Sequence, residues 1–232
     1  MPDTVMVTAP HPDDEVLGCG GSIARHVDAG RQVFVLYLSS GERGSPDRPP
    51  AQAGPLREQE AAEAMRTLGV PAANLLFLRF PDGGINPALL DQVGAVITAL
   101  RELRPELLYL PHPEDASFDH RAAFLLCWRA TAMAGSRNFR EWGTSPHWVP
   151  AVLGYEAWSP VREPAYLEDI DGALDRKLAA LACYRSQAAG AKGEGQATHV
   201  GAPAGFLSGF RGATTTGGHR EAFMVLRAGR VI

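Results

Sequence analysis

The chain has 232 residues, 45% hydrophobic and 21% charged, which is the balance of a globular protein large enough for one α/β core. A net charge of −4 and the lack of any run of Lys or Arg argue against nucleic-acid binding. The three cysteines are far apart and have no CxxC spacing, which argues against a disulfide framework and against a thiolate zinc site.

Short β-rich runs alternate with helical patterns through the first 133 residues. The expected strands are 5–8, 33–38, 75–80 and 106–110, and the expected helices are 15–29, 57–68, 88–103 and 119–133. Residues 43–55 are rich in Pro, Gly and polar side chains and predict a loop. This alternation predicts βαβ units, and therefore a doubly wound α/β fold with a mostly parallel sheet.

The order of elements changes after about residue 147. We expect a strand at 149–155, a helix at 174–184, a mobile Gly- and Ala-rich stretch at 187–205 and a last strand at 223–226. The interpretation is a single domain over 1–232, with a core at 1–146 and a C-terminal extension of the same domain at 147–232.

Polar side chains follow each of the first four expected strands. In open parallel sheets, ligands bind beyond the carboxyl ends of the strands. The residues there are His11 to Glu15, Ser39 to Arg43, Pro81 to Gly83, and then His112, Glu114, Asp115, Asp119 and His120. An acidic residue at a single strand end can be explained as the N-cap of the following helix. Acidic residues or His at all four strand ends favour a ligand site.

The set contains the donors of a catalytic zinc site. His11 and Asp14 are three residues apart and can chelate one ion while Asp13 points elsewhere, and His120 is the best third ligand. Zinc bound by three protein ligands lowers the pKa of its water to about 7. Asp13 can then take a proton from that water and give it to a leaving amine.

Other residues of the first helix have simpler interpretations. Gly18, Gly20 and Gly21 lack the spacing of a GxGxxG fingerprint, so we expect them to allow close helix–sheet packing. His26, on the later part of this helix, is expected at the surface.

At this point the residues show a family resemblance. The segment APHPDDE at 9–15, followed by LGCGG at 17–21, resembles the LmbE-like (PIG-L) family of zinc-dependent N-acetylglucosaminyl deacetylases. The similarity extends to REQEA at 57–61, FPDG at 80–83, DHR at 119–121 and YRSQ at 184–187, so it covers nearly the whole chain. It implies a Rossmann-like fold, a Zn²⁺ cofactor and hydrolysis of an acetamide on a glucosamine derivative.

The resemblance also implies roles for single residues. His11, Asp14 and His120 would be the zinc ligands, and Asp13 the general base. Three further residues, Glu42, Arg57 and Asp82, match positions that hold the sugar. Two of these also have simpler interpretations: Arg57 as a surface residue at a helix start, and Asp82 as a turn residue.

One position departs from the family pattern. Where the family often has a His three residues before the last ligand, this chain has Ser117, which can donate a hydrogen bond but cannot carry an imidazolium charge. We therefore expect Ser117 or His112 to stabilise the oxyanion. Asp119 is expected to orient the imidazole of His120.

Other functions stay open at this stage. The missing His is compatible with a non-catalytic zinc- and sugar-binding module, or with a hydrolase of another small N-acyl substrate. A Mg²⁺-dependent phosphotransfer or nucleotide-binding protein is disfavoured, because there is no P-loop and two His suit zinc better. Residues 43–55 and 187–205 are candidate lids over the substrate.

The expected partner is a small N-acetylated amino sugar, with no nucleic acid and no membrane. The N-terminus has no basic start followed by an apolar stretch, and no window approaches the roughly 20 apolar residues of a membrane span, so we expect a cytoplasmic protein. Because the family includes oligomers, homo-oligomerisation stays open.

Overall fold

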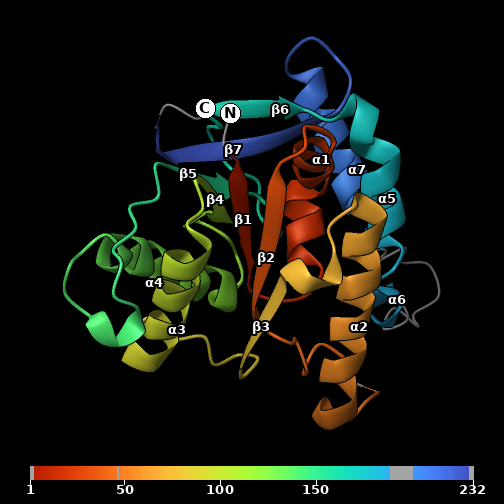
Figure 1. The fold of residues 1–232 in the computed structure, drawn as a ribbon. Coiled ribbons are helices and arrows are strands. Elements are labelled where there is room, and N and C mark those ends of the chain that lie inside the picture. The colour runs from red at the N-terminus through yellow and green to blue at the C-terminus, as the bar shows by residue number, and fades with distance from the viewer. Residues whose placement is uncertain (1–2, 46, 189–200, 230–232) are drawn as a thin grey trace.

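The computed structural model describes residues 3–45, 47–188 and 201–229, and within them seven strands form one sheet with helices on both faces (Figure 1). The strands are β1 (Thr4–Ala9), β2 (Gln32–Ser39), β3 (Leu75–Phe80), β4 (Leu107–Pro111), β5 (Ala151–Tyr155), β6 (Tyr166–Asp169) and β7 (Arg220–Arg227). The α-helices are α1 (Asp14–Asp28), α2 (Pro50–Leu68), α3 (Leu90–Leu103), α4 (Phe118–Ala134), α5 (Leu174–Leu181), α6 (Arg185–Ala188) and α7 (Gly201–Ala213).

The sheet confirms the predicted fold class. Its order is β3-β2-β1-β4-β5-β7-β6, and the pairs from β3 to β5 are all parallel, while β7 is antiparallel to both of its neighbours. The order reverses direction beside β1, as in a Rossmann-like doubly wound sheet. The carboxyl ends of β1 and β4 therefore lie side by side.

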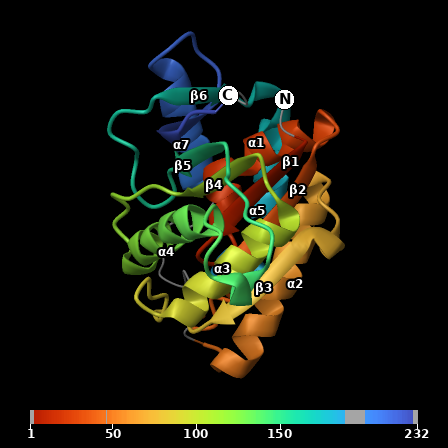
Figure 2. The same ribbon diagram turned by 60° about the vertical axis from the view of Figure 1, so that its left-hand side comes forward.

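Two helical layers cover the sheet. Helices α1, α2 and α5 pack on one face, and α3 and α4 on the other, where they come forward in Figure 2. Strands buried on both faces become nearly continuous apolar runs, as in VFVLYL of β2. Helix α1 approaches the sheet closely, since a Cβ at Gly18 would lie only 2.2 Å from the Tyr155 ring. The expected packing role of Gly18 is therefore confirmed.

Helix α2 begins earlier than predicted. It starts at Pro50 rather than at residue 57, so the prediction of a loop was wrong for the second half of 43–55. A proline at the first helical position loses no hydrogen bond, because that N–H has no partner within the helix. The following Ala-Gln-Ala are good helix formers, and the helix includes Pro55 in its second turn.

The C-terminal part differs in two ways. The four-residue strand β6 was missed, because its run is too short to show a period. Of the stretch 187–205 predicted to be mobile, residues 189–200 lie outside the described residues, whereas 201–205 begin helix α7. The predicted division at 146/147 falls within a continuous sheet, because β5, β7 and β6 extend it beyond β4.

His26 lies in the interior, so the prediction of a surface position was wrong. It is 7% exposed, and its Nε2 lies 2.9 Å from the Tyr109 hydroxyl. None of the helices in the described part of the chain is both long and apolar enough to cross a bilayer.

Candidate functional site

The structure brings the three predicted metal ligands together. His11 follows β1, Asp14 is the first residue of α1, and His120 lies in the first turn of α4. Asp14 Oδ2 is 3.3 Å from His11 Nδ1 and 3.1 Å from His120 Nε2, and ligand atoms of all three lie within 4.8 Å of one another. The neighbouring carboxyl ends of β1 and β4 produce this convergence.

These residues fit a zinc ion. Two imidazoles and one carboxylate are a common zinc donor set. Both ring nitrogens of His120 are buried and make no hydrogen bond with the described residues, since the contact with Asp14 lacks hydrogen-bond geometry. Buried polar atoms rarely lack a partner, so these nitrogens are available to a cation.

The charges around the group also favour a cation. Burial alone would lower the pKa of His120, but the Asp14 and Asp115 carboxylates raise it to about 9. Burial would likewise raise the pKa of Asp14, yet the charges of His120 and His11 hold it well below its ordinary range. Asp82 and Asp119 add two carboxylates next to His11 Nε2, at 3.3 and 3.1 Å.

Asp13 lines the pocket beside the ligands but is not one of the grouped ligand residues. Its φ of 125° is a strained conformation for a non-glycine residue. Although Asp13 is at the N-cap of α1, its side chain makes no capping bond, and Oδ2 instead lies 3.3 Å from Arg57 Nη2. Hydrogen bonds also fix the backbone: Asp13 N donates to Glu15 Oε2 at 3.0 Å, and Asp13 O accepts from Val16 N at 3.1 Å and from Leu17 N at 2.9 Å. Burial raises the pKa of Asp13 to about 7, against the lowering effect of Arg57.

Arg57 connects two loops of the site. It is 3% exposed and lies in the middle of α2, so its interpretation as a surface residue at a helix start was wrong. Its guanidinium donates to Gly41 O at 2.9 Å and to Pro12 O at 2.5 Å. Gly41 has a φ of +61°, and a Cβ there would lie 2.2 Å from Arg57 Nη1, so glycine leaves the space that the guanidinium fills.

The other two predicted sugar contacts lie at different depths. Asp82 Oδ1 is 3.3 Å from His11 Nε2, while its Oδ2 accepts from Arg43 N at 2.9 Å. Glu42 stands behind Asp82, since its Oε1 accepts from Asp82 N at 2.9 Å and its Oε2 accepts from Ser39 Oγ at 3.3 Å. Asp82 therefore borders the ligand group, and Glu42 holds the loop that carries Asp82.

The structure does not bring His112 or Ser117 into the ligand group. His112 Nε2 lies 2.9 Å from Ser159 O, and its Nδ1 accepts from Glu114 N at 3.3 Å, so both ring nitrogens are engaged in loops. Ser117 is the N-cap of α4, and its backbone N donates to Asp115 Oδ1 at 2.9 Å. The Ser117 side chain makes no capping bond.

Asp115 and Trp158 are two site residues to which the sequence analysis assigned no role. Asp115 Oδ2 lies 3.6 Å from His120 Nδ1 and accepts from Trp158 N at 3.1 Å. Asp119 faces His11 instead, so the expectation that it orients His120 was wrong. The indole of Trp158 donates to Asp14 Oδ1 at 3.2 Å. Because Trp158 comes three residues after β5, extending the strand-end rule to a fifth strand would have found it.

The ligand group opens into a pocket of about 150 Å³. Its lining combines acidic, basic, amide and aromatic groups from seven loops or helices, contributed by His11, Asp13, Asp14, Gly44, Arg57, Asp82, Trp158 and Gln187. Trp158 is half-exposed and supplies an aromatic wall.

Three relatives indicate what the chain is similar to. Residues 6–131 match the family model of PIG-L, GlcNAc-PI de-N-acetylase. The chain is 30% identical to diacetylchitobiose deacetylase of Thermococcus kodakarensis, over 79% of this chain and 69% of the relative. It is 28% identical to 1D-myo-inositol 2-acetamido-2-deoxy-alpha-D-glucopyranoside deacetylase of Streptomyces avermitilis, over 86% and 83%. It is also 28% identical to 4-oxalmesaconate hydratase of Pseudomonas putida, over 79% and 74%.

Solved structures agree on the fold. The conserved protein TT1542 from Thermus thermophilus is 32% identical, with a TM-score of 0.82 over 100% of this chain and 98% of that one. N,N'-diacetylchitobiose deacetylase from Pyrococcus horikoshii is 23% identical, with a TM-score of 0.84 over 97% and 84%, which supports the same fold.

Proposed function

Because the chain belongs to the PIG-L family, we propose that it is a metal-dependent hydrolase that removes the acetyl group from an N-acetylglucosamine derivative. One observation carries the proposal. Ligand atoms of His11, Asp14 and His120 converge, the buried Nε2 of His120 makes no hydrogen bond within the described part of the chain, and Asp13 lines the same pocket. Hydrolysis of an amide needs an activated water and a nearby proton carrier, and this arrangement offers a place for both.

We infer that His11, Asp14 and His120 hold Zn²⁺. When bound, zinc would polarise the acetamide carbonyl and lower the pKa of a water to about 7. Asp13 is the proton carrier in this proposal, because it lines the pocket with His11 and Asp14 and its carboxylate is held by Arg57 at 3.3 Å. Asp13 accepts a proton from the attacking water and returns it to the nitrogen of the leaving amino sugar.

The side chains that line the pocket are the ones we propose to contact the substrate. Asp82 and Gln187 line the pocket and offer an acceptor and an amide to sugar hydroxyls, and Trp158 offers an apolar ring face. Arg57 and Glu42 hydrogen-bond to backbone groups of neighbouring loops. In this proposal they do not contact the sugar but position Asp13 and Asp82. Neither Ser117 nor His112 lines the pocket, and both ring nitrogens of His112 are engaged, so we assign neither of them to the oxyanion.

A second candidate is addition of water to a small unsaturated acid. It is favoured by the 28% identity to 4-oxalmesaconate hydratase, which is as high as the identity to one of the deacetylases. The serine at position 117, where an imidazole is expected, is compatible with a changed reaction. An activated water and a carboxylate base serve both reactions.

The deciding experiment follows acetate and free-amine release from a panel of substrates. The panel contains N-acetylglucosamine, N,N'-diacetylchitobiose, GlcNAc-inositol and GlcNAc-malate, with hydration of 4-oxalmesaconate measured in parallel. Zn²⁺-loaded protein, chelator-treated protein and Asp13→Ala are compared. We expect release that needs both the metal and Asp13. Zinc binding without release from any sugar would reject the deacetylase, and 4-oxalmesaconate hydration would then identify the second candidate.

A further inference from the structure

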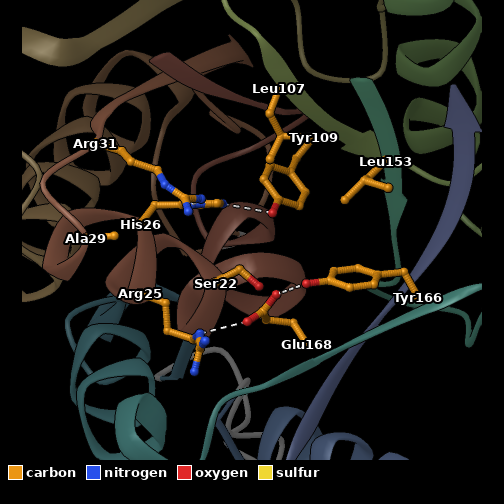
Figure 3. Close-up of a pocket in the computed structure, with 10 residues that line it drawn as sticks. All are labelled: Ser22, Arg25, His26, Ala29, Arg31, Leu107, Tyr109, Leu153, Tyr166 and Glu168. Carbon is orange, nitrogen blue, oxygen red and sulfur yellow. Dashed lines mark hydrogen bonds and ion pairs between the residues drawn. The ribbon is translucent and has the colours of Figure 1, made fainter. Parts of the chain in front are cut away.

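A second cavity lies near the other end of α1 (Figure 3). Its volume is about 360 Å³, within the usual range of small-molecule sites. Its walls come from the C-terminal half of α1, the turn after it, and strands β4, β5 and β6, and no residue is shared with the pocket at His11. Asp14 begins α1, and the first α1 residue in the cavity wall is Ser22, eight residues further on, so about 12 Å of helix separates the two sites.

Two tyrosine rings form a preformed apolar part of this cavity. The rings of Tyr109 and Tyr166 both pack on Phe223, with centroids 5.2 and 5.9 Å away. Leu107 and Leu153 add aliphatic surface next to Tyr109. Side chains fixed by packing lose little freedom when a ligand binds, which favours a flat apolar ligand body.

A chain of hydrogen bonds connects Arg31, His26 and Tyr109, and the arginine decides which atom donates in each of them. Arg31 Nη1 lies 2.6 Å from His26 Nδ1, and because a guanidinium only donates, Nδ1 must be the acceptor. The proton of the neutral ring is then on Nε2, which donates to the Tyr109 hydroxyl at 2.9 Å. Burial, together with the charges of Arg31 and Arg25, lowers the pKa of His26 to about 3, in agreement with a neutral ring.

The end of this chain is a hydrogen-bond donor. Tyr109 Oη accepts from His26, and its own proton meets no acceptor among the described residues. In Figure 3 this hydroxyl lies among the side chains that line the cavity. A hydroxyl polarised by a guanidinium through an imidazole is a strong donor, which suits an anionic acceptor.

The single carboxylate of the lining does not oppose an anion. Glu168 is bound by Arg25 Nε at 2.7 Å and by the Tyr166 hydroxyl, so its negative charge is matched. Arg31 keeps its positive charge whatever else it contacts. We propose that this cavity is a second binding site, for a small flat apolar molecule that carries one carboxylate accepting the Tyr109 hydroxyl proton.

Calorimetric titration of the zinc-loaded full chain tests the site with two probes that share one ring system. Indole-3-acetate carries the carboxylate, and tryptamine carries an ammonium group in its place. We expect indole-3-acetate to bind at least tenfold more tightly than tryptamine. Tyr109→Phe, which removes only the hydroxyl, should weaken indole-3-acetate about tenfold, as expected for one hydrogen bond to a charged group.

A blocking variant locates the binding. Ala29 lines the cavity and is exposed, so Ala29→Trp covers the opening without disturbing the core and should abolish binding. Ala132→Trp makes the same change at an exposed position on α4 and should leave binding intact. Thermal melts check that every variant is folded. The proposal is overturned if neither probe binds, if both bind equally, or if indole-3-acetate binds Ala29→Trp as tightly as the unchanged chain.

Discussion

The indole Nε1 of Trp158 donates a hydrogen bond to Oδ1 of Asp14 at 3.2 Å, between residues 144 positions apart. The other carboxylate oxygen, Oδ2, faces His11 and His120. One oxygen of Asp14 is thereby held by the loop after β5, and the second is left for the ligand group. Such contacts behind a ligand orient it and adjust its affinity for metal.

Replacing Trp158 by Phe should weaken zinc binding while leaving the fold intact. The phenyl ring keeps the aromatic wall but cannot donate to Asp14 Oδ1, so the carboxylate loses its fixed orientation. We expect a loss of about 10- to 100-fold in zinc affinity, measured by competition with a chromogenic chelator. Trp148→Phe is the matched control, because Trp148 is also about half-exposed but stacks on Arg227, away from the ligands. Equal zinc affinity in the two variants would contradict the assigned role.

Arg57→Lys should reduce turnover strongly. A lysine offers one ammonium group where the guanidinium binds Pro12 O, Gly41 O and the Asp13 carboxylate together. Because Asp13 would lose its fixed direction, we expect kcat for acetate release to fall about 10- to 100-fold. Arg66→Lys, at an exposed position of the same helix, should keep full activity. Unchanged kcat in Arg57→Lys would show that the guanidinium does not position Asp13.

The buried pair of Lys177 and Glu221 should contribute strongly to folding. Their charged atoms are 2.6 Å apart, both side chains are 2% exposed, and Glu221 also accepts from the backbone N of Gly21 and Ser22 in α1. Lys177→Met leaves a buried carboxylate without its counter-charge, so we expect a loss of about 3–5 kcal/mol in the free energy of unfolding. That corresponds to a fall of about 6–20 °C in Tm for a chain of this size.

A surface pair supplies the comparison for this prediction. Arg176 and Asp28 also connect α5 to α1, but both side chains are partly exposed. Arg176→Met should therefore lower the free energy of unfolding far less than Lys177→Met does. Urea denaturation of both variants measures their free energies of unfolding. Similar losses in the two would show that burial does not strengthen the contribution of the Lys177–Glu221 pair.

His26 should make stability depend on pH in the mildly acidic range. Burial and the charges of Arg31 and Arg25 lower its pKa from 6.5 to about 3, so below about pH 6.5 the unfolded chain binds a proton that the folded chain does not. The stability that His26 contributes is complete above about pH 6.5 and is lost as the pH falls toward 3. In His26→Gln the fall in unfolding free energy between about pH 7 and pH 5 should be smaller than in the unchanged chain. Parallel pH profiles for the two would refute the assignment.

The alternation of apolar and turn residues predicted most of the core elements closely. The expected strand at 75–80 coincides with β3, and the expected helix at 15–29 differs from α1 by one residue at each end. Where the prediction failed, local signals were ambiguous. Proline marks loops on average, yet Pro50 begins a helix, and the four residues of β6 acquire their role only by pairing with β7.

In the candidate site too, some residues could be grouped from the sequence, and others could not. His11, Asp13 and Asp14 are placed by the turn between β1 and α1, and the strand-end rule brings His120 to the same edge, so a local pattern and one general rule were sufficient to group them. Asp115 and Asp119 are both close to His120 in sequence, and only the direction of each side chain decides that Asp115 faces His120 while Asp119 faces His11.

The sequence by itself determined the doubly wound fold, the donor types and the strand ends where they gather, because hydrophobic period and turn chemistry are local properties of the chain. Tertiary structure alone decided that Trp158 holds Asp14, that Arg57 is buried against Asp13, and that His26 lies between Arg31 and Tyr109 beside a second cavity. These pairs join residues brought together by crossovers and side-chain packing, and no spacing along the chain encodes which side chains meet or which hydrogen bonds they form.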